Sequence, residues 1–198
     1  MAPALKTIGI FGGTFNPVHI GHTIIDDYLR QICGLTEVWM MLSPLNPLKA
    51  SSDEIVADDS RLEMLRLAVK NVPGVVASDF ELSMPRPSYT YVTLKKLQSQ
   101  FPDYDFALII GADNWKIFNL WRDFDKIFEE FKVIIYPRDG FDVDIETLPQ
   151  NVTLTDTPRM EISSTFIRNS IARGLDMNLF LPEGVYSYIK QHNLYGRK

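Results

Sequence analysis

The sequence predicts an α/β protein with a doubly wound, mostly parallel sheet and a C-terminal helical segment. Short apolar runs of strand length alternate with segments of helical periodicity, as expected for parallel βαβ units. The apolar runs are nearly continuous, which is typical of strands covered on both faces. The longest of them, such as Val38–Leu42 and Phe106–Ile110, are far shorter than the roughly 18 apolar residues that a membrane span needs.

The predicted elements begin with an N-terminal strand and a long helix. The apolar run Thr7–Phe11, which stops at Gly12-Gly13, predicts a buried strand. The spacing of apolar residues becomes helical from Ile20, and Gly34 is a suitable end for this helix. The face that we expect this helix to bury carries Ile24, Ile25, Tyr28, Leu29 and Ile32.

The middle of the chain continues the alternation. Ser60 and Glu63 form a capping-box pattern, which predicts a helix that begins near Ser60. A further helix is expected over Tyr91–Gln100, with Val92 on its buried face. The strands predicted in this region are Glu37–Leu42, Val75–Ser78 and Asp105–Ile110.

The last third of the chain is expected to complete one domain over residues 1–198. We find no internal repeat and no segment of low complexity in the sequence. In doubly wound folds, ligands bind in the crevice at the carboxyl ends of the strands, so the loops there are expected to form the site. The remaining predicted elements are the helix Asp123–Phe131, the strands Lys132–Tyr136 and Val152–Leu154, and the helices Ser163–Ala172 and Val185–His192.

Charge and cysteine content exclude several classes of protein. The chain has 198 residues, with 20 Lys and Arg against 25 Asp and Glu, so its net charge is −5. We therefore expect no nucleic-acid polymer as a partner, because such binding needs many cations, although a few local cations still suffice for a small anion. The single Cys33 cannot form an intrachain disulfide or a Cys-rich zinc site. Without a signal-peptide pattern or an apolar span, we expect a cytoplasmic protein that does not bind membranes.

The first candidate site is a glycine-rich turn between a strand and a helix. Residues 12–22 read GGTFNPVHIGH. Glycines let a backbone approach a phosphate closely, and a helix N-terminus presents unpaired N–H groups. His19 and His22 are three residues apart, so both imidazoles share one face of the first turn and can donate hydrogen bonds to phosphate oxygens. A zinc site is not expected, because no third ligand lies nearby in the sequence.

The second candidate site lies near the C-terminus, where residues 162–168 read ISSTFIR. Hydroxyl and N–H groups at a helix start can hold phosphate oxygens, and Arg168 adds a cation on the same helix. Taken alone, Ser-Ser-Thr before a helix is more often an ordinary N-cap.

Together, the two motifs resemble those of the nucleotidyltransferase branch of the class I aminoacyl-tRNA-synthetase-like superfamily. Gly-x-Phe-x-Pro-x-His-x-x-His is followed, roughly 145 residues later, by Ile-Ser-Ser-Thr-x-x-Arg. Over nearly its whole length, the chain most resembles the bacterial-type nicotinate-nucleotide adenylyltransferases. This resemblance implies a Rossmann-like nucleotidyltransferase fold.

Three further segments carry the resemblance. They are the substrate-loop segment Pro87–Thr90, the segment Gly111–Asn114 with the downstream Trp121, and the loop Pro44–Lys49, which is similar to Pro-x-x-Pro-His-Lys.

Two residues depart from the family pattern. Leu48 stands where the family usually has histidine, which puts one polar substrate contact in doubt. Val92 stands where an acidic residue is common, which implies another way of fixing the substrate loop.

The resemblance implies transfer of AMP from ATP to nicotinate mononucleotide, which gives nicotinate adenine dinucleotide and pyrophosphate. His19, His22 and Arg168 are the implied catalytic residues, acting by positioning and charge stabilisation. Mg²⁺ would bind mainly through the ATP phosphates, without dedicated protein ligands. The implied ATP contacts are Gly12, Gly13, Thr14, Phe15, His19, His22, Gly111, Asp113, Arg138, Ile162, Ser163, Ser164, Thr165 and Arg168.

The implied contacts of nicotinate mononucleotide are Lys49, Tyr89, Thr90 and Trp121. Lys49 would meet its phosphate, and backbone N–H groups near Thr90 suit its carboxylate. The face of Trp121 suits the pyridine ring, with Trp115 as a competitor for this role.

Other acceptors and another class of protein stay open at this point. Nicotinamide mononucleotide and phosphopantetheine are alternative acceptors. A non-catalytic nucleotide-binding module is disfavoured, because His19, His22 and Arg168 are all present. The oligomeric state is open, with a homo-oligomer among the alternatives.

Overall fold

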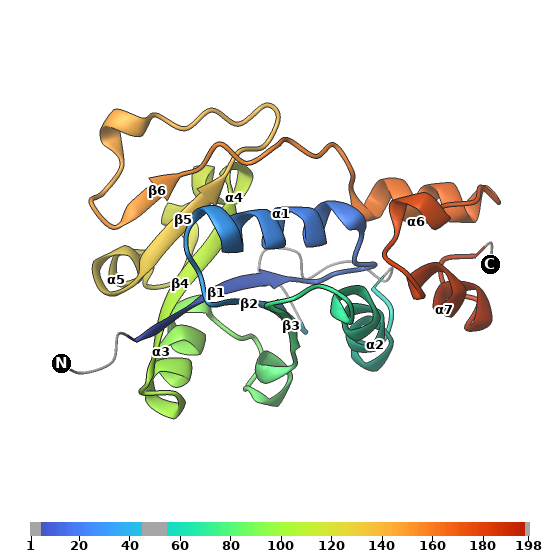
Figure 1. Ribbon diagram of the computed structural model, residues 1–198, viewed down its shortest axis with the longest axis horizontal. Helices are drawn as coiled ribbons and strands as arrows, with labels where there is room; N and C mark the ends of the chain where they lie inside the picture. The colour runs from blue at the N-terminus through green and yellow to red at the C-terminus, as the bar shows by residue number, and fades with distance from the viewer. Residues whose placement is uncertain (1–4, 45–54, 197–198) are drawn as a thin grey trace.

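The computed structural model describes residues 5–44 and 55–196, and its centre is a parallel sheet of six strands. The order β3-β2-β1-β4-β5-β6 places β1 and β4 side by side, so the strand order reverses between them. This confirms the predicted doubly wound α/β fold (Figure 1). The strands are β1 (Lys6–Gly13), β2 (Glu37–Leu42), β3 (Val75–Ser78), β4 (Tyr104–Gly111), β5 (Lys132–Tyr136) and β6 (Val152–Leu154).

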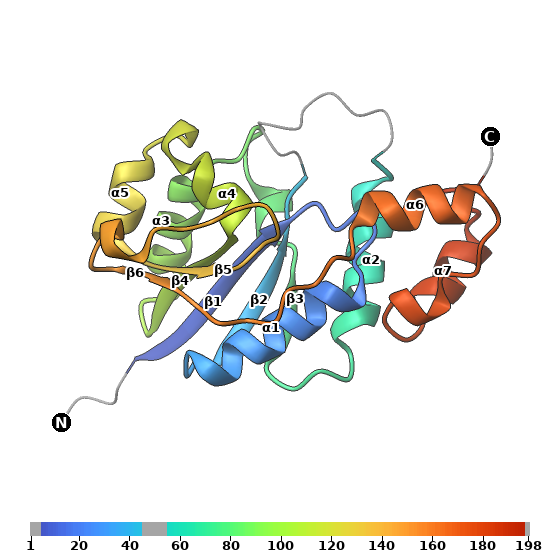
Figure 2. The same ribbon diagram turned by 90° about the horizontal axis from the view of Figure 1, so that it is seen from above.

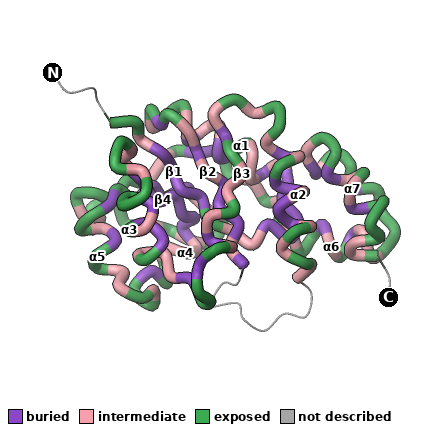
Figure 3. The backbone as a smooth tube through the Cα atoms, turned by 90° about the horizontal axis from the view of Figure 1, so that it is seen from below, coloured by how far each residue is buried: buried purple, intermediate pink, exposed green. Residues whose placement is uncertain are grey.

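Helices cover both faces of the sheet. In β1, Phe11 faces the core beneath α1, whereas Ile8 and Ile10 face the opposite core, as the alternation of a strand requires. Figure 3 shows the buried residues concentrated along the central strands. The helices are α1 (Ile20–Ile32), α2 (Asp58–Val69), α3 (Thr90–Gln100), α4 (Ala112–Lys116), α5 (Phe124–Glu130), α6 (Ser164–Ala172) and α7 (Val185–Gln191), and the short 3₁₀ turns are η1 (Phe80–Ser83), η2 (Phe118–Leu120), η3 (Ile145–Thr147) and η4 (Asn178–Phe180).

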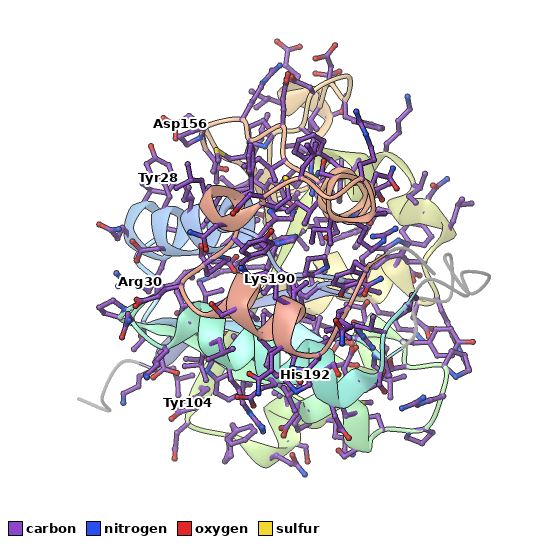
Figure 4. All side chains as sticks on the ribbon, turned by 90° about the vertical axis from the view of Figure 1, so that its right-hand side faces the viewer. Tyr28, Arg30, Tyr104, Asp156, Lys190 and His192 are labelled. Carbon is purple, nitrogen blue, oxygen red and sulfur yellow. The ribbon has the colours of Figure 1, made fainter. Side chains whose placement is uncertain are left out.

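The C-terminal helices α6 and α7 extend the core on the side of α1 and α2. Ile167 of α6 and Val185 and Ile189 of α7 are buried in the same cluster as residues of α1 and α2. Figure 2 shows the two helices beyond the end of the sheet, with the start of α6 next to the start of α1. His192 follows α7 on the exposed surface (Figure 4). The described residues include no helix that is long and apolar enough to cross a membrane.

Three local predictions are wrong. The helix α2 begins at Asp58, not near Ser60, because Asp58 and Asp59 in its first turn complement the helix dipole. On α1, Ile24 and Ile32 lie at the edge of the buried face and are exposed, and Asp26 is buried instead.

On α3, Val92 is exposed, and the adjacent Thr93 is buried. Thr93 can be buried in place of Val92 because its hydroxyl group donates a hydrogen bond to Glu81 inside the protein.

Candidate active site

A cavity of about 530 Å³ lies at the carboxyl ends of the central strands, where the strand order reverses. Lys49 and Leu48 lie outside the described residues. Every other predicted site residue lines the cavity: Gly12, Gly13, Thr14, Phe15, His19, His22, Tyr89, Thr90, Gly111, Asp113, Trp121, Arg138, Ile162, Ser163, Ser164, Thr165 and Arg168.

The two motif histidines form a stacked pair at the start of α1. His19 is the N-cap residue, and its backbone N–H donates to Nδ1 of His22 at 3.1 Å. The two ring centroids are 3.6 Å apart, with an angle of 24° between the planes. Because Nδ1 of a neutral His22 accepts this bond, its proton is on Nε2. His22 therefore offers one N–H donor of defined identity.

Burial keeps both rings uncharged at neutral pH. It lowers the pKa of His19 to about 3, and the positive charge of Arg138 contributes to this shift. The pKa of His22 is also well below its ordinary value, first because of burial and then because of His19 and Arg138. The prediction that these imidazoles donate hydrogen bonds therefore becomes more specific, since they do so as neutral groups, not as cations.

The two sequence motifs meet, because α6 is bonded to the loop that follows β1. Ser164 Oγ donates to the carbonyl of Pro17 at 2.8 Å, and Arg168 Nη1 donates to the carbonyl of Asn16 at 3.0 Å. Tyr195, near the C-terminus, donates to Asn16 Oδ1 at 2.8 Å. The hydroxyl proton of Ser164 is thus used within the protein, and Ser163, Ser164 and Thr165 line the cavity.

Ser163 is the N-cap of α6, as the ordinary interpretation of this segment predicts. Its Oγ accepts the N–H of Phe166 at 3.1 Å. The hydroxyl oxygen therefore caps the helix, and this bond sets where α6 begins beside α1.

An aspartate and an arginine face each other across the end of the sheet. Asp113 lies in the first turn of α4, whose N-cap is Gly111. Arg138 Nε is 3.5 Å from Asp113 Oδ1, and Arg138 Nη2 donates to the hydroxyl of Tyr136 at 3.1 Å. A Cβ at Gly111 would lie 2.3 Å from Asp113 Oδ1. Glycine at this position therefore makes room for the carboxylate.

Of the two tryptophans that could stack on the pyridine ring of the acceptor, one lines the cavity and the other does not. Trp121 lines the cavity, and its ring centroid is 5.2 Å from that of Phe118. Trp115 does not line it, and stacks on Phe118 with centroids 5.1 Å apart. Trp121 shares this end of the cavity with Tyr89 and Thr90 at the start of α3.

Sequence reasoning missed a buried carboxylate that fixes the substrate-loop segment. Glu81 of η1 lines the cavity with 7% of its surface exposed. It accepts hydroxyl hydrogen bonds from Ser43 at 2.8 Å, Ser88 at 3.3 Å and Thr93 at 2.8 Å. Glu81 thus holds the loop in place of an acid at the exposed Val92. A single Glu in a short turn carries no periodic signal that could have identified it.

Sequence reasoning also missed a fully buried arginine behind the cavity. Arg61 Nη1 donates to the carbonyls of Thr14 at 2.6 Å and Ser43 at 3.0 Å, so it joins the loops after β1 and β2. Its Nη2 pairs with Asp58, whose other oxygen accepts from Arg86 Nη2 at 2.7 Å. Arg61 lies on α2 together with the exposed Arg66. The spacing of residues in the sequence does not show which of these two arginines is buried.

The fold and the two converging helix starts define a nucleotidyltransferase of the cytidylyltransferase-like class. The model of the cytidylyltransferase-like family matches residues 10–170, and the chain belongs to this family.

Curated relatives narrow this class to one kind of enzyme. A Bacteroides fragilis (strain YCH46) protein named "Probable nicotinate-nucleotide adenylyltransferase" is 48% identical over 183 residues, which are 92% of this chain and 90% of the relative. A Bacteroides thetaiotaomicron protein of the same name is 48% identical over 188 residues, covering 95% of this chain and 92% of the relative.

Solved structures agree with this fold. Nicotinic acid mononucleotide adenylyltransferase of Plasmodium falciparum, in its complex with NaAD, superposes with a TM-score of 0.79 at 23% identity and covers 96% of this chain and 97% of that one. Its complex with APC gives a TM-score of 0.78 at 22% identity, with the same coverage.

Proposed function

We propose that this protein is a nicotinate-nucleotide adenylyltransferase, which transfers AMP from ATP to nicotinate mononucleotide in NAD biosynthesis. The observation that carries the proposal is the convergence of the two distant motifs. The His19–His22 pair and the start of α6 meet at the cavity, which Trp121 also lines. We also infer that residues 1–198 act as one domain, because α6 and α7 share a core with α1 and α2.

In the proposed reaction, an oxygen of the acceptor's 5′-phosphate attacks the α-phosphorus of ATP. A new O–P bond forms, the bond from the α-phosphorus to the bridging oxygen breaks, and pyrophosphate leaves with the electron pair. The attacking oxygen is already anionic, so no protein nucleophile is needed. Catalysis then depends on positioning and on stabilising the charge that develops on the phosphates.

The charge-stabilising groups are placed at the ATP end of the cavity. His19 and His22 donate neutral N–H groups to the ATP phosphates, and Arg168 with the N–H groups at the start of α6 holds the β- and γ-phosphates. Gly12, Gly13, Thr14 and Phe15 border the same space, and Gly111, Asp113 and Arg138 border its neighbouring wall.

We infer that Mg²⁺ arrives with ATP and binds mainly through the ATP phosphates. The described residues contain no group of three or more His, Cys, Asp or Glu side chains that could hold a metal. Asp113 Oδ1 is buried without a hydrogen-bond partner in the described chain and faces Arg138, so this carboxylate could orient metal-bound water. When bound, the ion would neutralise phosphate charge.

On the acceptor side, Trp121 stacks on the pyridine ring, and the N–H groups near Thr90 at the start of α3 receive its carboxylate. The contact of Lys49 with the acceptor phosphate stays a prediction. A cytoplasmic location and a homo-oligomer also stay predictions.

The test is pyrophosphate release from Mg²⁺-ATP with each of three acceptors: nicotinate mononucleotide, nicotinamide mononucleotide and phosphopantetheine. We expect the highest kcat/KM with nicotinate mononucleotide. Pyrophosphate from phosphopantetheine alone would reject the substrate, and release from none of the three would reject the activity.

A further inference from the structure

Arg122 is a cation of the cavity to which neither motif assigns a role. It follows Trp121 and lines the cavity, and its guanidinium lies over the ring of Tyr89, with Cζ 4.7 Å from the ring centroid. The contact joins the segment after η2 to the N-cap residue of α3. A cation is therefore held between the proposed stacking residue and the helix start that faces the acceptor.

The ion pair of Arg122 leaves its charge available to a ligand. Its Nε is 3.7 Å from Asp123 Oδ2, at the edge of ion-pair distance, and its side chain is 62% exposed. Asp123 is held more closely by Lys126, at 2.7 Å. An exposed pair of this length is weak, so a carboxylate ligand can compete with Asp123 for the guanidinium.

The other arginines that line the described cavity are engaged by groups of the protein. Arg138 pairs with Asp113 and bonds to Tyr136, and Arg168 bonds to the carbonyl of Asn16. Arg122 is thus the cavity arginine that lies beside Trp121 and Tyr89.

The corner of the cavity formed by Arg122, Tyr89 and the start of α3 contains hydrogen-bond donors that distinguish a carboxylate from its amide. A guanidinium donates hydrogen bonds and accepts none. The first backbone N–H groups of α3 are also donors only, and the side chain of the N-cap residue makes no capping bond to them. A carboxylate offers acceptors on both oxygens and can bind a guanidinium through two bonds. A carboxamide turns an NH₂ group toward one of these donors and loses that bond.

The corner also contains a negative charge that the acceptor must tolerate. Glu81 is buried in the same cavity, and its charge is solvated by three hydroxyl groups. A second carboxylate nearby is unfavourable unless a cation offsets it. Arg122 can supply that positive charge.

We propose that Arg122 is a specificity-determining residue, which binds the pyridine carboxylate and thereby favours nicotinate over nicotinamide mononucleotide. This inference rests on the function proposed above.

The experiment compares kcat/KM for the two mononucleotides, measured by pyrophosphate release, in the full-length protein and in Arg122→Gln. For nicotinate mononucleotide, we expect Arg122→Gln to lower kcat/KM about tenfold, mainly through KM, because a partly exposed charge-assisted bond is lost. For nicotinamide mononucleotide, kcat/KM should stay within about twofold, so that the ratio of the two falls about tenfold.

Two further variants separate specificity from structure. Arg122→Lys keeps the charge but not the two-bond geometry, so it should retain part of the preference for the acid. Arg66→Gln changes an exposed arginine on α2, away from the cavity, and should leave the ratio unchanged.

Equal losses with both acceptors would show a contact with the shared ribose phosphate and overturn the inference, as would an unchanged ratio in Arg122→Gln. These outcomes leave the proposed function standing, because the wild-type protein would still release pyrophosphate. No release by the wild-type protein with either mononucleotide would reject both.

Discussion

The ATP end and the acceptor end of the cavity differ in how their functional groups are held. At the ATP end, His19 is 5% exposed, and backbone groups bond the loop after β1 to α1 and α6. At the acceptor end, Glu81 is buried and accepts three hydroxyl hydrogen bonds, but the side chain of Arg122, which is proposed to select the acceptor, is 62% exposed. Buried, mutually bonded groups are preorganised for one ligand, whereas exposed side chains can be exchanged at little cost in stability. The triphosphate site is therefore formed by groups that the fold itself holds in place, whereas exposed side chains at the rim of the cavity select the acceptor.

The largest effect is expected where the two ends are joined. Replacing Arg61 by methionine removes the donor to the carbonyls of Thr14 and Ser43 and leaves Asp58 without this partner. We expect Arg61→Met to lower the free energy of unfolding by about 3 kcal/mol or more, measured by urea denaturation. Arg66→Met on the exposed side of the same helix should cost less than about 1 kcal/mol. Equal stability of the two variants would mean that Arg61 does not join the two ends.

At the ATP end, His22→Ala removes both a phosphate donor and the acceptor of the His19 N–H. We expect kcat to fall by roughly a hundredfold or more, while the KM for the acceptor changes little, because the lost interaction acts on the transition state. Steady-state kinetics on a folded variant check this. His192→Ala, on the exposed surface after α7, is the matched control and should keep full activity. A folded His22→Ala protein with normal kcat would exclude the assigned role.

At the acceptor end, the effect should be smaller and limited to one substrate. Trp121→Ala is expected to raise the KM for nicotinate mononucleotide by up to about tenfold through loss of ring stacking, and to leave the KM for ATP unchanged. Trp115→Ala removes a ring that stacks on Phe118 outside the cavity, so it should affect stability more than KM. A rise in KM with Trp115→Ala alone would reverse the assignment of the two tryptophans.

The smallest effect concerns a carboxyl group buried on α1. Asp26 lies four residues after His22, is fully buried, and its carboxyl oxygens make no hydrogen bond within the described chain. Burial raises the pKa of Asp26 well above its ordinary value, so the folded state holds its proton while the unfolded state has already lost it. Stability from this group is present below about pH 4 and is lost as the pH rises toward the folded pKa.

Asp26→Asn should therefore raise the melting temperature at pH 7 by a few degrees, and the gain should disappear below about pH 4. Thermal unfolding across this pH range checks the sign. Asp27→Asn on the same helix is the control, and it should give no such gain, because Asp27 is paired with Arg30 at 3.0 Å. A gain in Asp26→Asn that is independent of pH would show that charge is not its cause.

The two ends also differ in how far sequence reasoning reached. Both phosphate motifs follow a fixed spacing, and the structure brings them together through bonds such as Ser164 Oγ to Pro17. The acceptor end was predicted only in part. Glu81 and Arg122 belong to no motif, and each acts through residues far away in the chain, such as Ser43 and Tyr89. No local pattern records such contacts.

The sequence by itself determined the alternation of strands and helices and the chemistry of the two motifs. These follow from short-range properties, namely apolar periodicity and residue spacing, and the strands Glu37–Leu42 and Val75–Ser78 have the predicted bounds. Only the tertiary structure decided which polar groups are buried. Removal from water depends on neighbours from distant segments, and it makes His19 and His22 neutral and places Arg61 behind both loops.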